Sequence, residues 1–99
     1  MSNKPLVSIV ITSKNEAGVI EKNLKSLKRQ TYKNIEVIVV DNHSTDATVA
    51  IAKKFTNKIY SLGPERSAQR NFGASKSKGE YLLFLDADME LTPDVISQC

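Results

Sequence analysis

Short apolar runs separated by polar segments dominate the pattern of the chain. Four runs of five or six residues are predominantly apolar or β-branched, which is typical of strands that are buried on both faces. They cover residues 7–12, 35–40, 58–62 and 80–85. We expect them to form a parallel sheet, because a sheet with one exposed face would show alternating apolar and polar positions instead.

Amphipathic segments between these runs predict helices. The first covers residues 19–30, the second follows a cap at Ser44 or Thr45, and the third covers residues 65–78. A last helix is expected to begin after Thr92. The apolar residues that recur at helical spacing, and should therefore face the sheet, are Ile20, Leu24, Leu27, Ala47, Ile51, Phe55, Ala68 and Phe72.

The alternation of strands and helices predicts an α/β fold, a Rossmann-like parallel sheet with helices on both faces. Right-handed crossovers and doubly wound connectivity give the strand order 3-2-1-4. The second and third strands are then added on one side of the first strand and the fourth strand on its other side. The direction in which strands are added across the sheet therefore reverses between the first and fourth strands. Ligands of such sheets bind outside the carboxyl ends of the strands, near that reversal.

Acidic and amide side chains gather at those carboxyl ends. Residues 12–16 follow the first strand, residues 41–44 follow the second, and residues 86–88 follow the fourth. A parallel sheet places these three segments at one end, which we call the carboxyl end of the sheet. We expect the functional site there.

Asp86 and Asp88 are two carboxylates separated by one residue at the end of the fourth strand. Such a pair can bind one divalent cation, and Mg²⁺ prefers oxygen ligands and leaves coordination positions for substrate phosphates. The cation would make a diphosphate a better leaving group. The alternatives are that one Asp caps a turn, or that Asp86 hydrogen-bonds a sugar hydroxyl instead of the metal.

Two further pairs could contact a nucleotide. Asp41 and Asn42 lie where a base or ribose would sit, although the segment DNHSTD is equally suited to a turn and helix cap. Arg66 and Arg70 are four residues apart, and guanidinium groups suit phosphate oxygens; the alternative is a solvent-exposed face. His43 is the only histidine and lacks a partner for a metal site. Glycine-rich dinucleotide and P-loop motifs are absent.

The composition is that of an ordinary globular protein, with 40% hydrophobic and 25% charged residues, and 99 residues allow one domain. Without a membrane-spanning run or a signal peptide, and with Cys99 as its only cysteine, the chain is expected in the cytoplasm. The net charge of +3 leaves contact with anionic lipid at the inner face of a membrane open. It is too small to predict nucleic-acid binding, and no aromatic stacking platform accompanies it.

The segments VSIVITSKNEAGVIEKNLKSLKRQTYKNIEVIVVDNHSTDAT and RNFGASKSKGEYLLFLDAD closely resemble the family 2 glycosyltransferases with the GT-A fold. The resemblance covers nearly the whole chain, and several motifs fall in the family's order. It implies transfer of a sugar from a nucleoside-diphosphate donor to an acceptor with Mg²⁺ or Mn²⁺, in a pathway such as the biosynthesis of cell-envelope polysaccharides.

The resemblance also implies roles for residues on the nucleoside side. Thr12, Asn15 and Glu16 look like the first nucleotide-binding loop of the family. Asp41 and Asn42 match the pair that reads the base, although many members have Asp where this chain has Asn42. The donor that the resemblance implies is a UDP-sugar.

On the diphosphate side, Arg70 matches the arginine of the family's RN segment, which lies near the donor phosphates. Asp86 and Asp88 match its D-x-D motif. In that motif the second Asp is typically the metal ligand, and the first contacts the ribose or the metal.

Catalytic domains of the family are more than twice as long, and their second half carries the acceptor site and the general base. Glu90 is too close to the D-x-D motif to replace that base. We therefore expect residues 1–99 to be one partial GT-A domain without its acceptor side, inactive by itself. The alternative is a non-catalytic nucleotide-binding or oligomerisation module of the same fold, dimerising through the open edge at the fourth strand. A nucleotidyltransferase is disfavoured because SKNEAGV is a poor phosphate loop.

Overall fold

The computed structural model describes residues 5–87. Strands and helices alternate along the chain as β1 (Val7–Ser13), α1 (Ala17–Lys28), β2 (Ile35–Asp41), α2 (Thr48–Ala52), β3 (Ile59–Ser61), α3 (Arg66–Lys76) and β4 (Tyr81–Asp86). All paired strands are parallel and follow the order β3-β2-β1-β4. The predicted fold class and strand order are therefore confirmed. The helix expected after Thr92 lies outside the described residues, as does Asp88.

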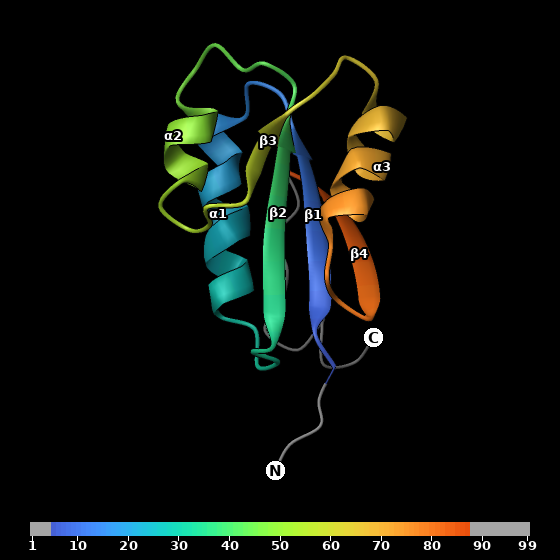
Figure 1. Ribbon diagram of the computed structural model, residues 1–99. Helices are drawn as coiled ribbons and strands as arrows, with labels where there is room; N and C mark the ends of the chain where they lie inside the picture. Colours follow the sequence, from blue (N-terminus) through green and yellow to red (C-terminus); the bar gives the residue numbers. More distant parts are fainter. Residues whose placement is uncertain (1–4, 88–99) are drawn as a thin grey trace.

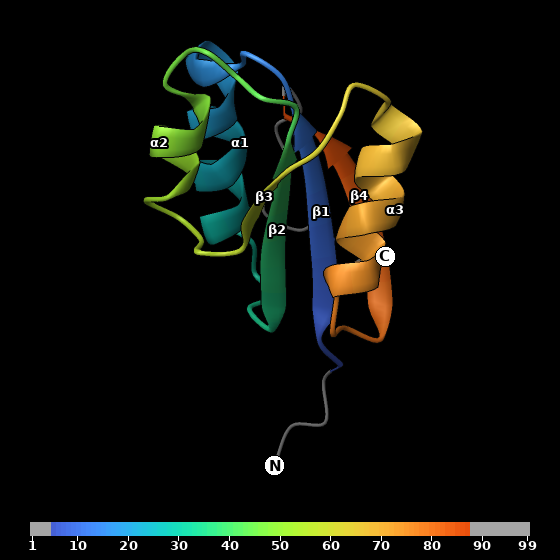
Figure 2. The same cartoon turned by 45° about the horizontal axis from the view of Figure 1, so that its top comes forward.

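The helices cover both faces of the sheet, as predicted. α1 and α2 lie on one face and α3 lies on the other, in both views of the molecule (Figures 1 and 2). All four strands run in the same direction, so the loops that follow β1, β2 and β3 gather at one end, at the top of Figure 1. This is the carboxyl end of the sheet, where the candidate residues are expected.

The larger core lies between the sheet and the helices α1 and α2. The inward-facing residues predicted in α1, which are Ile20, Leu24 and Leu27, are all buried. The prediction for α2 is wrong in one position, since Ala47 is exposed and Thr48 is buried instead. The fully buried members of this core are Ile9, Ile11, Ile20, Leu24, Leu27, Val39, Ala52, Leu85 and Ala87.

The smaller core lies between the sheet and α3, where Phe72 packs against Val10, Ile38 and Val40 together with Tyr60 and Leu62. It shows that continuous apolar strands serve two cores, one on each face, with successive residues pointing to opposite sides.

The prediction that Ala68 faces the sheet is wrong, because Ala68 is exposed and its neighbour Gln69 is buried. The Gln69 Nε2 amide donates hydrogen bonds to the carbonyl oxygens of Val40 at 2.9 Å and of Ser13 at 3.5 Å. A buried carbonyl at the end of a strand needs a donor, and Gln69 supplies one. This polar requirement sets the orientation of α3.

Gly73 lets α3 approach the sheet closely. A Cβ atom at this position would lie 2.4 Å from Cγ1 of Val10, a distance that real side chains do not tolerate. The glycine that weakens the helical pattern of residues 65–78 is therefore required by the packing of α3 on β1.

Glu36 is a buried carboxylate at the opposite, amino end of the sheet. Its Oε1 accepts hydrogen bonds of 2.5 Å from Ser8 Oγ and from the backbone N of Lys78, and Oε2 accepts one of 2.5 Å from Lys58 Nζ. Burial acts to raise the pKa of Glu36, but the hydrogen bonds from Lys58, Ser8 and Lys78 outweigh it and lower the pKa to about 2. The network joins β1, β2 and the residues that precede β3 and β4.

Candidate functional site

Asp86 lies at the junction of β1 and β4, where the chain direction across the sheet reverses. It is the register partner of Thr12, whose Oγ1 donates a hydrogen bond of 3.2 Å to Asp86 Oδ1. Asn23 of α1 donates from Nδ2 to the Asp86 carbonyl at 3.0 Å, and Ala87 N donates to the Thr12 carbonyl at 3.1 Å. The backbone of Asp86 is thus held on both sides, and its carboxylate is placed where the sequence predicts a ligand site.

Two arginines of α3 converge on the same carboxylate oxygen. Nη1 of Arg66 lies 3.4 Å and Nη2 of Arg70 lies 3.8 Å from Asp86 Oδ1. The side chain of Arg66 is 54% exposed, that of Arg70 is 44% exposed and that of Asp86 is 34% exposed. The single carboxylate balances only one of the two positive charges. The group therefore carries a surplus positive charge that can attract an anion.

Asp41 is buried and serves the turn after β2. Its Oδ1 accepts from Ser13 Oγ at 2.6 Å and from Ser44 Oγ at 2.6 Å, and its Oδ2 accepts from Ser44 N at 2.7 Å. Of the two roles that the sequence leaves open, the contacts therefore support the turn. The helix cap expected at Ser44 or Thr45 is wrong, because α2 begins at Thr48 and its first amide donates to Asp46 Oδ1 at 3.0 Å.

Asn42 is half-buried beside the connection from β3 to α3. Its backbone N donates to the Ser13 carbonyl at 2.9 Å, which ties it to the end of β1. Its side chain fills the space next to Gly63, where an added Cβ would lie 2.1 Å from Asn42 Oδ1. Asn42 therefore lies between the ends of β1 and β3, on the carboxyl side of the sheet.

The loops that follow β1 and β2 are joined by hydrogen bonds that the sequence does not reveal. Glu16 N donates to Thr48 Oγ1 at 2.8 Å, and Ala17 N donates to Asp46 Oδ2 at 3.2 Å. These side chains cap the start of α1 from more than 25 positions away. Hydrogen bonds lower the pKa of Asp46, and the bond from the Thr48 hydroxyl has the largest effect. Asp46 is thereby kept as an ionised carboxylate, which accepts hydrogen bonds.

Asp86 could hold a hard cation only together with further oxygen ligands, because its Oδ1 already contacts Arg66, Arg70 and Thr12. Among residues 5–87, no group of three His, Cys, Asp or Glu side chains could hold a metal ion. Asp86 offers carboxylate oxygens beside the Thr12 hydroxyl. Mg²⁺ and Mn²⁺ accept such oxygen ligands, and Mg²⁺ typically binds through one or two carboxylates together with substrate phosphates.

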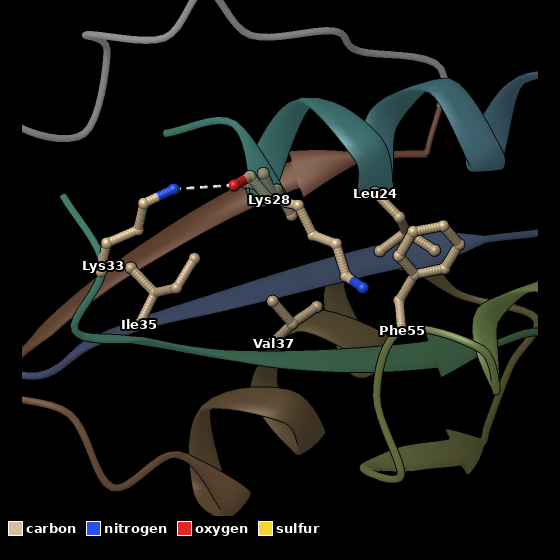
Figure 3. Close-up of a pocket in the computed structure, with 7 residues that line it drawn as sticks. Leu24, Lys28, Lys33, Ile35, Val37 and Phe55 are labelled. Atoms are coloured by element: carbon tan, nitrogen blue, oxygen red, sulfur yellow. Dashed lines mark hydrogen bonds between the residues drawn. The ribbon is translucent and has the colours of Figure 1, made fainter. Parts of the chain in front are cut away.

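A pocket of about 260 Å³ lies far from this site, between the end of α1 and the start of β2 (Figure 3). Lys28 Nζ lies 5.1 Å from the centre of the Phe55 ring, and Lys33 Nζ donates to the Lys28 carbonyl at 2.8 Å. The pocket is lined by Leu24, Leu27, Lys28, Lys33, Ile35, Val37 and Phe55. It contains none of the carboxylates or amides expected to bind a nucleotide, so the candidate site is at the carboxyl end.

None of the helices among residues 5–87 has both the length and the hydropathy of a transmembrane span.

Comparison with known proteins identifies the family. The sequence model of Glycosyl transferase family 2 matches residues 8–99. The chain belongs to this family. It is 32% identical to the GalNAc(5)-diNAcBac-PP-undecaprenol beta-1,3-glucosyltransferase of Campylobacter jejuni, over 94% of this chain and 33% of that protein. It is 41% identical to the glycosyltransferase AglE of Haloferax volcanii, over 88% of this chain and 32% of that protein. The chain thus spans about a third of the length of these relatives.

Solved structures of family members share the fold. TarS of S. aureus in complex with UDP-GlcNAc superposes with a TM-score of 0.82 at 30% identity, over 93% of this chain and 29% of that chain. The mannosyltransferase PcManGT of Pyrobaculum calidifontis, in complex with GDP-Man and Mn²⁺, gives a TM-score of 0.79 at 26% identity, over 90% of this chain and 29% of that chain. The predicted family and the GT-A fold are therefore confirmed, and the sheet corresponds to the N-terminal region of that fold.

Proposed function

We propose that this chain is the donor-binding part of a glycosyltransferase and binds a nucleoside-diphospho-sugar together with Mg²⁺ or Mn²⁺. The observation that carries the proposal is the convergence of Arg66 and Arg70 on Asp86 at the reversal point of the sheet. The similarity to TarS with UDP-GlcNAc and to PcManGT with GDP-Man and Mn²⁺ supports the ligand class.

On the diphosphate side, Arg66 and Arg70 would bind phosphate oxygens, for which their paired guanidinium groups at the carboxyl end are suited. Asp86 and Asp88 would hold the cation, with Asp86 also within reach of the ribose. The cation, when bound, would neutralise the charge of the departing diphosphate. Thr12 would keep the Asp86 carboxylate in place through its hydroxyl.

On the nucleoside side, the loop after β1 and the loop after β2 would form the binding surface. Glu16 and Asn42, whose side chains are partly exposed, would contact the nucleoside, and the buried Asp41 would shape the turn from beneath. We expect a UDP-sugar as the donor, as in the TarS complex, with a GDP-sugar as the competing choice, as in the PcManGT complex.

We propose that residues 1–99 contain neither the acceptor-binding site nor the general base. Because relatives are about three times as long, we propose that the chain is one partial GT-A domain and that it transfers no sugar by itself. We further propose a role in the biosynthesis of cell-envelope polysaccharides at the inner face of the membrane; the name of the C. jejuni relative specifies an undecaprenol-linked, and therefore lipid-linked, substrate for that protein.

Calorimetric titration of UDP, GDP and TDP with Mn²⁺ tests the donor site. We expect saturable binding of at least one nucleotide, and loss of most of that binding when EDTA removes the metal. The isolated sugar should not bind measurably, because the polar groups described above are proposed to bind the diphosphate and the nucleoside. A folded sample that binds none of the three nucleotides would refute the proposal.

The free edge of β4 supports a second function, assembly through this strand. Within residues 5–87, β4 pairs only with β1, and its side chains Tyr81, Leu82 and Phe84 are 61%, 41% and 40% exposed. An exposed apolar edge strand pairs readily with another chain. We expect the 99-residue chain to form a dimer that Leu82→Lys weakens, as measured by sedimentation at several concentrations. A strict monomer would rule out this second function.

A further inference from the structure

Asn15 is the centre of a continuous set of hydrogen bonds between the loops that follow β1 and β2. Its Oδ1 accepts from the backbone N of Thr45 at 2.8 Å and of Asp46 at 3.4 Å, and its own backbone N donates to Ser44 Oγ at 2.7 Å. Ser44 Oγ in turn donates to Asp41 Oδ1 at 2.6 Å. We call these five residues the Asn15 clasp.

Asn15 combines two properties that this position requires. Its φ of 50° lies in the left-handed region, which glycine and asparagine adopt most readily. Its short carboxamide also places one oxygen in front of two consecutive backbone amides, and the Thr45 hydroxyl lies 3.4 Å from the same oxygen. A carbonyl oxygen has two lone pairs, so these donors already occupy Oδ1. Asn15 Oδ1 is therefore turned toward the neighbouring loop.

We propose that Asn15 is a positioning residue for nucleotide binding and that it acts through the clasp instead of contacting the nucleotide. The inference rests on the proposed function, since the two joined loops carry Glu16 and Asn42, which are proposed to face the nucleoside. Loops that are already joined need no further ordering when the ligand binds, and such preorganisation raises affinity. Without the clasp, each loop would lose conformational freedom only at the moment of binding.

Three variants of the protein separate this role from a general effect on folding. Asn15→Gly keeps the left-handed backbone accessible but removes the acceptor, whereas Asn15→Asp keeps an acceptor oxygen at the same place. Thr45→Val removes only the hydroxyl and leaves the Thr45 amide. The dissociation constants for UDP and GDP with Mn²⁺ are measured by calorimetry, and circular dichroism and melting temperature report folding.

We expect Asn15→Gly to weaken nucleotide binding about tenfold while the chain stays folded. Asn15→Asp should bind more tightly than the glycine variant, and Thr45→Val should stay within about threefold of the wild type. Hydrogen exchange of the Thr45 and Asp46 amides should become faster in Asn15→Gly. An Asn15→Gly variant that binds as tightly as the wild type, or an Asn15→Asp variant that binds as weakly as Asn15→Gly, would overturn the inference.

The hydrogen-exchange measurement distinguishes the two ways of failing. If the wild type binds a nucleotide and Asn15→Gly binds it equally well, only the positioning role is wrong. If the wild type binds neither UDP nor GDP while the Thr45 and Asp46 amides still exchange faster in Asn15→Gly, the clasp exists but the proposed function is wrong, and the binding role of Asn15 fails with it.

Discussion

Asp86→Asn is expected to weaken the binding of UDP or GDP in the presence of Mn²⁺ by at least about tenfold. The substitution preserves the size of the side chain and an oxygen that can accept from Thr12, but removes the charge that is proposed to hold the cation. In EDTA, which removes the metal, the substitution should no longer weaken binding. The variant should then bind the free nucleotide at least as tightly as the wild type. The reason is that Arg66 and Arg70 lose a competing anion. Calorimetric titration with and without metal measures both effects.

Glu80→Gln is the matched control for this experiment. It makes the same change of charge at an exposed position just before β4, at the opposite end of the strand from Asp86. It should leave the dissociation constant unchanged within about twofold in both solutions, since exposed charges far from a site are screened. Binding to Asp86→Asn with wild-type affinity in the presence of Mn²⁺ would argue against a metal role for Asp86.

Glu36→Gln is expected to remove up to about 3 kcal/mol of stability at pH 7, with the loss vanishing in acid. The pKa of Glu36 is lowered from 4.5 to about 2 in the folded protein, so folding favours its ionised form. That contribution is fully present above about pH 4.5 and is lost as the pH falls toward 2. The difference in free energy of unfolding between wild type and variant should close over this window, as measured by urea denaturation at a series of pH values.

Glu21→Gln provides the comparison for Glu36. Glu21 is partly exposed and forms a surface ion pair with Lys25, at 3.9 Å, so its substitution should change the stability by less than about 1 kcal/mol at every pH. If Glu36→Gln and Glu21→Gln show the same dependence on pH, the network of Glu36 with Ser8, Lys58 and Lys78 does not stabilise the fold as described.

The strands follow from the sequence because they are short, mostly apolar runs, and their order follows from right-handed crossovers. Burial on both faces holds for the central strands β1 and β2 but not for the edge strand β4, where Tyr81, Leu82 and Phe84 are exposed. The phase of the helices is harder to predict, since it depends on polar groups that other elements present. Gln69 turns inward because the carbonyls of Val40 and Ser13 need a donor, and Ala68 is then exposed. A pattern based on hydrophobicity alone assigns these two residues the other way round.

The candidate site, like the fold, could be predicted from the sequence only in part. Topology alone brings the segments that contain Thr12, Asp41 and Asp86 to one end of the sheet, so their proximity can be predicted from the strand order. The individual contacts cannot, because they depend on distances between elements that are remote in the chain. The convergence of Arg66 on Asp86, and the capping of α1 by residues of the loop after β2, have no local signature in the sequence.

Mapping of a bound nucleotide by NMR tests the central claim most directly. The amide chemical shifts of the ¹⁵N-labelled chain are recorded during titration with UDP or GDP in the presence of Mg²⁺. We predict that the largest changes occur at the carboxyl end of the sheet, at Thr12, Asn42, Arg70 and Ala87, with little change around Ile35 in the pocket between α1 and β2. Changes concentrated in that pocket, or no changes at saturating nucleotide, would contradict the account.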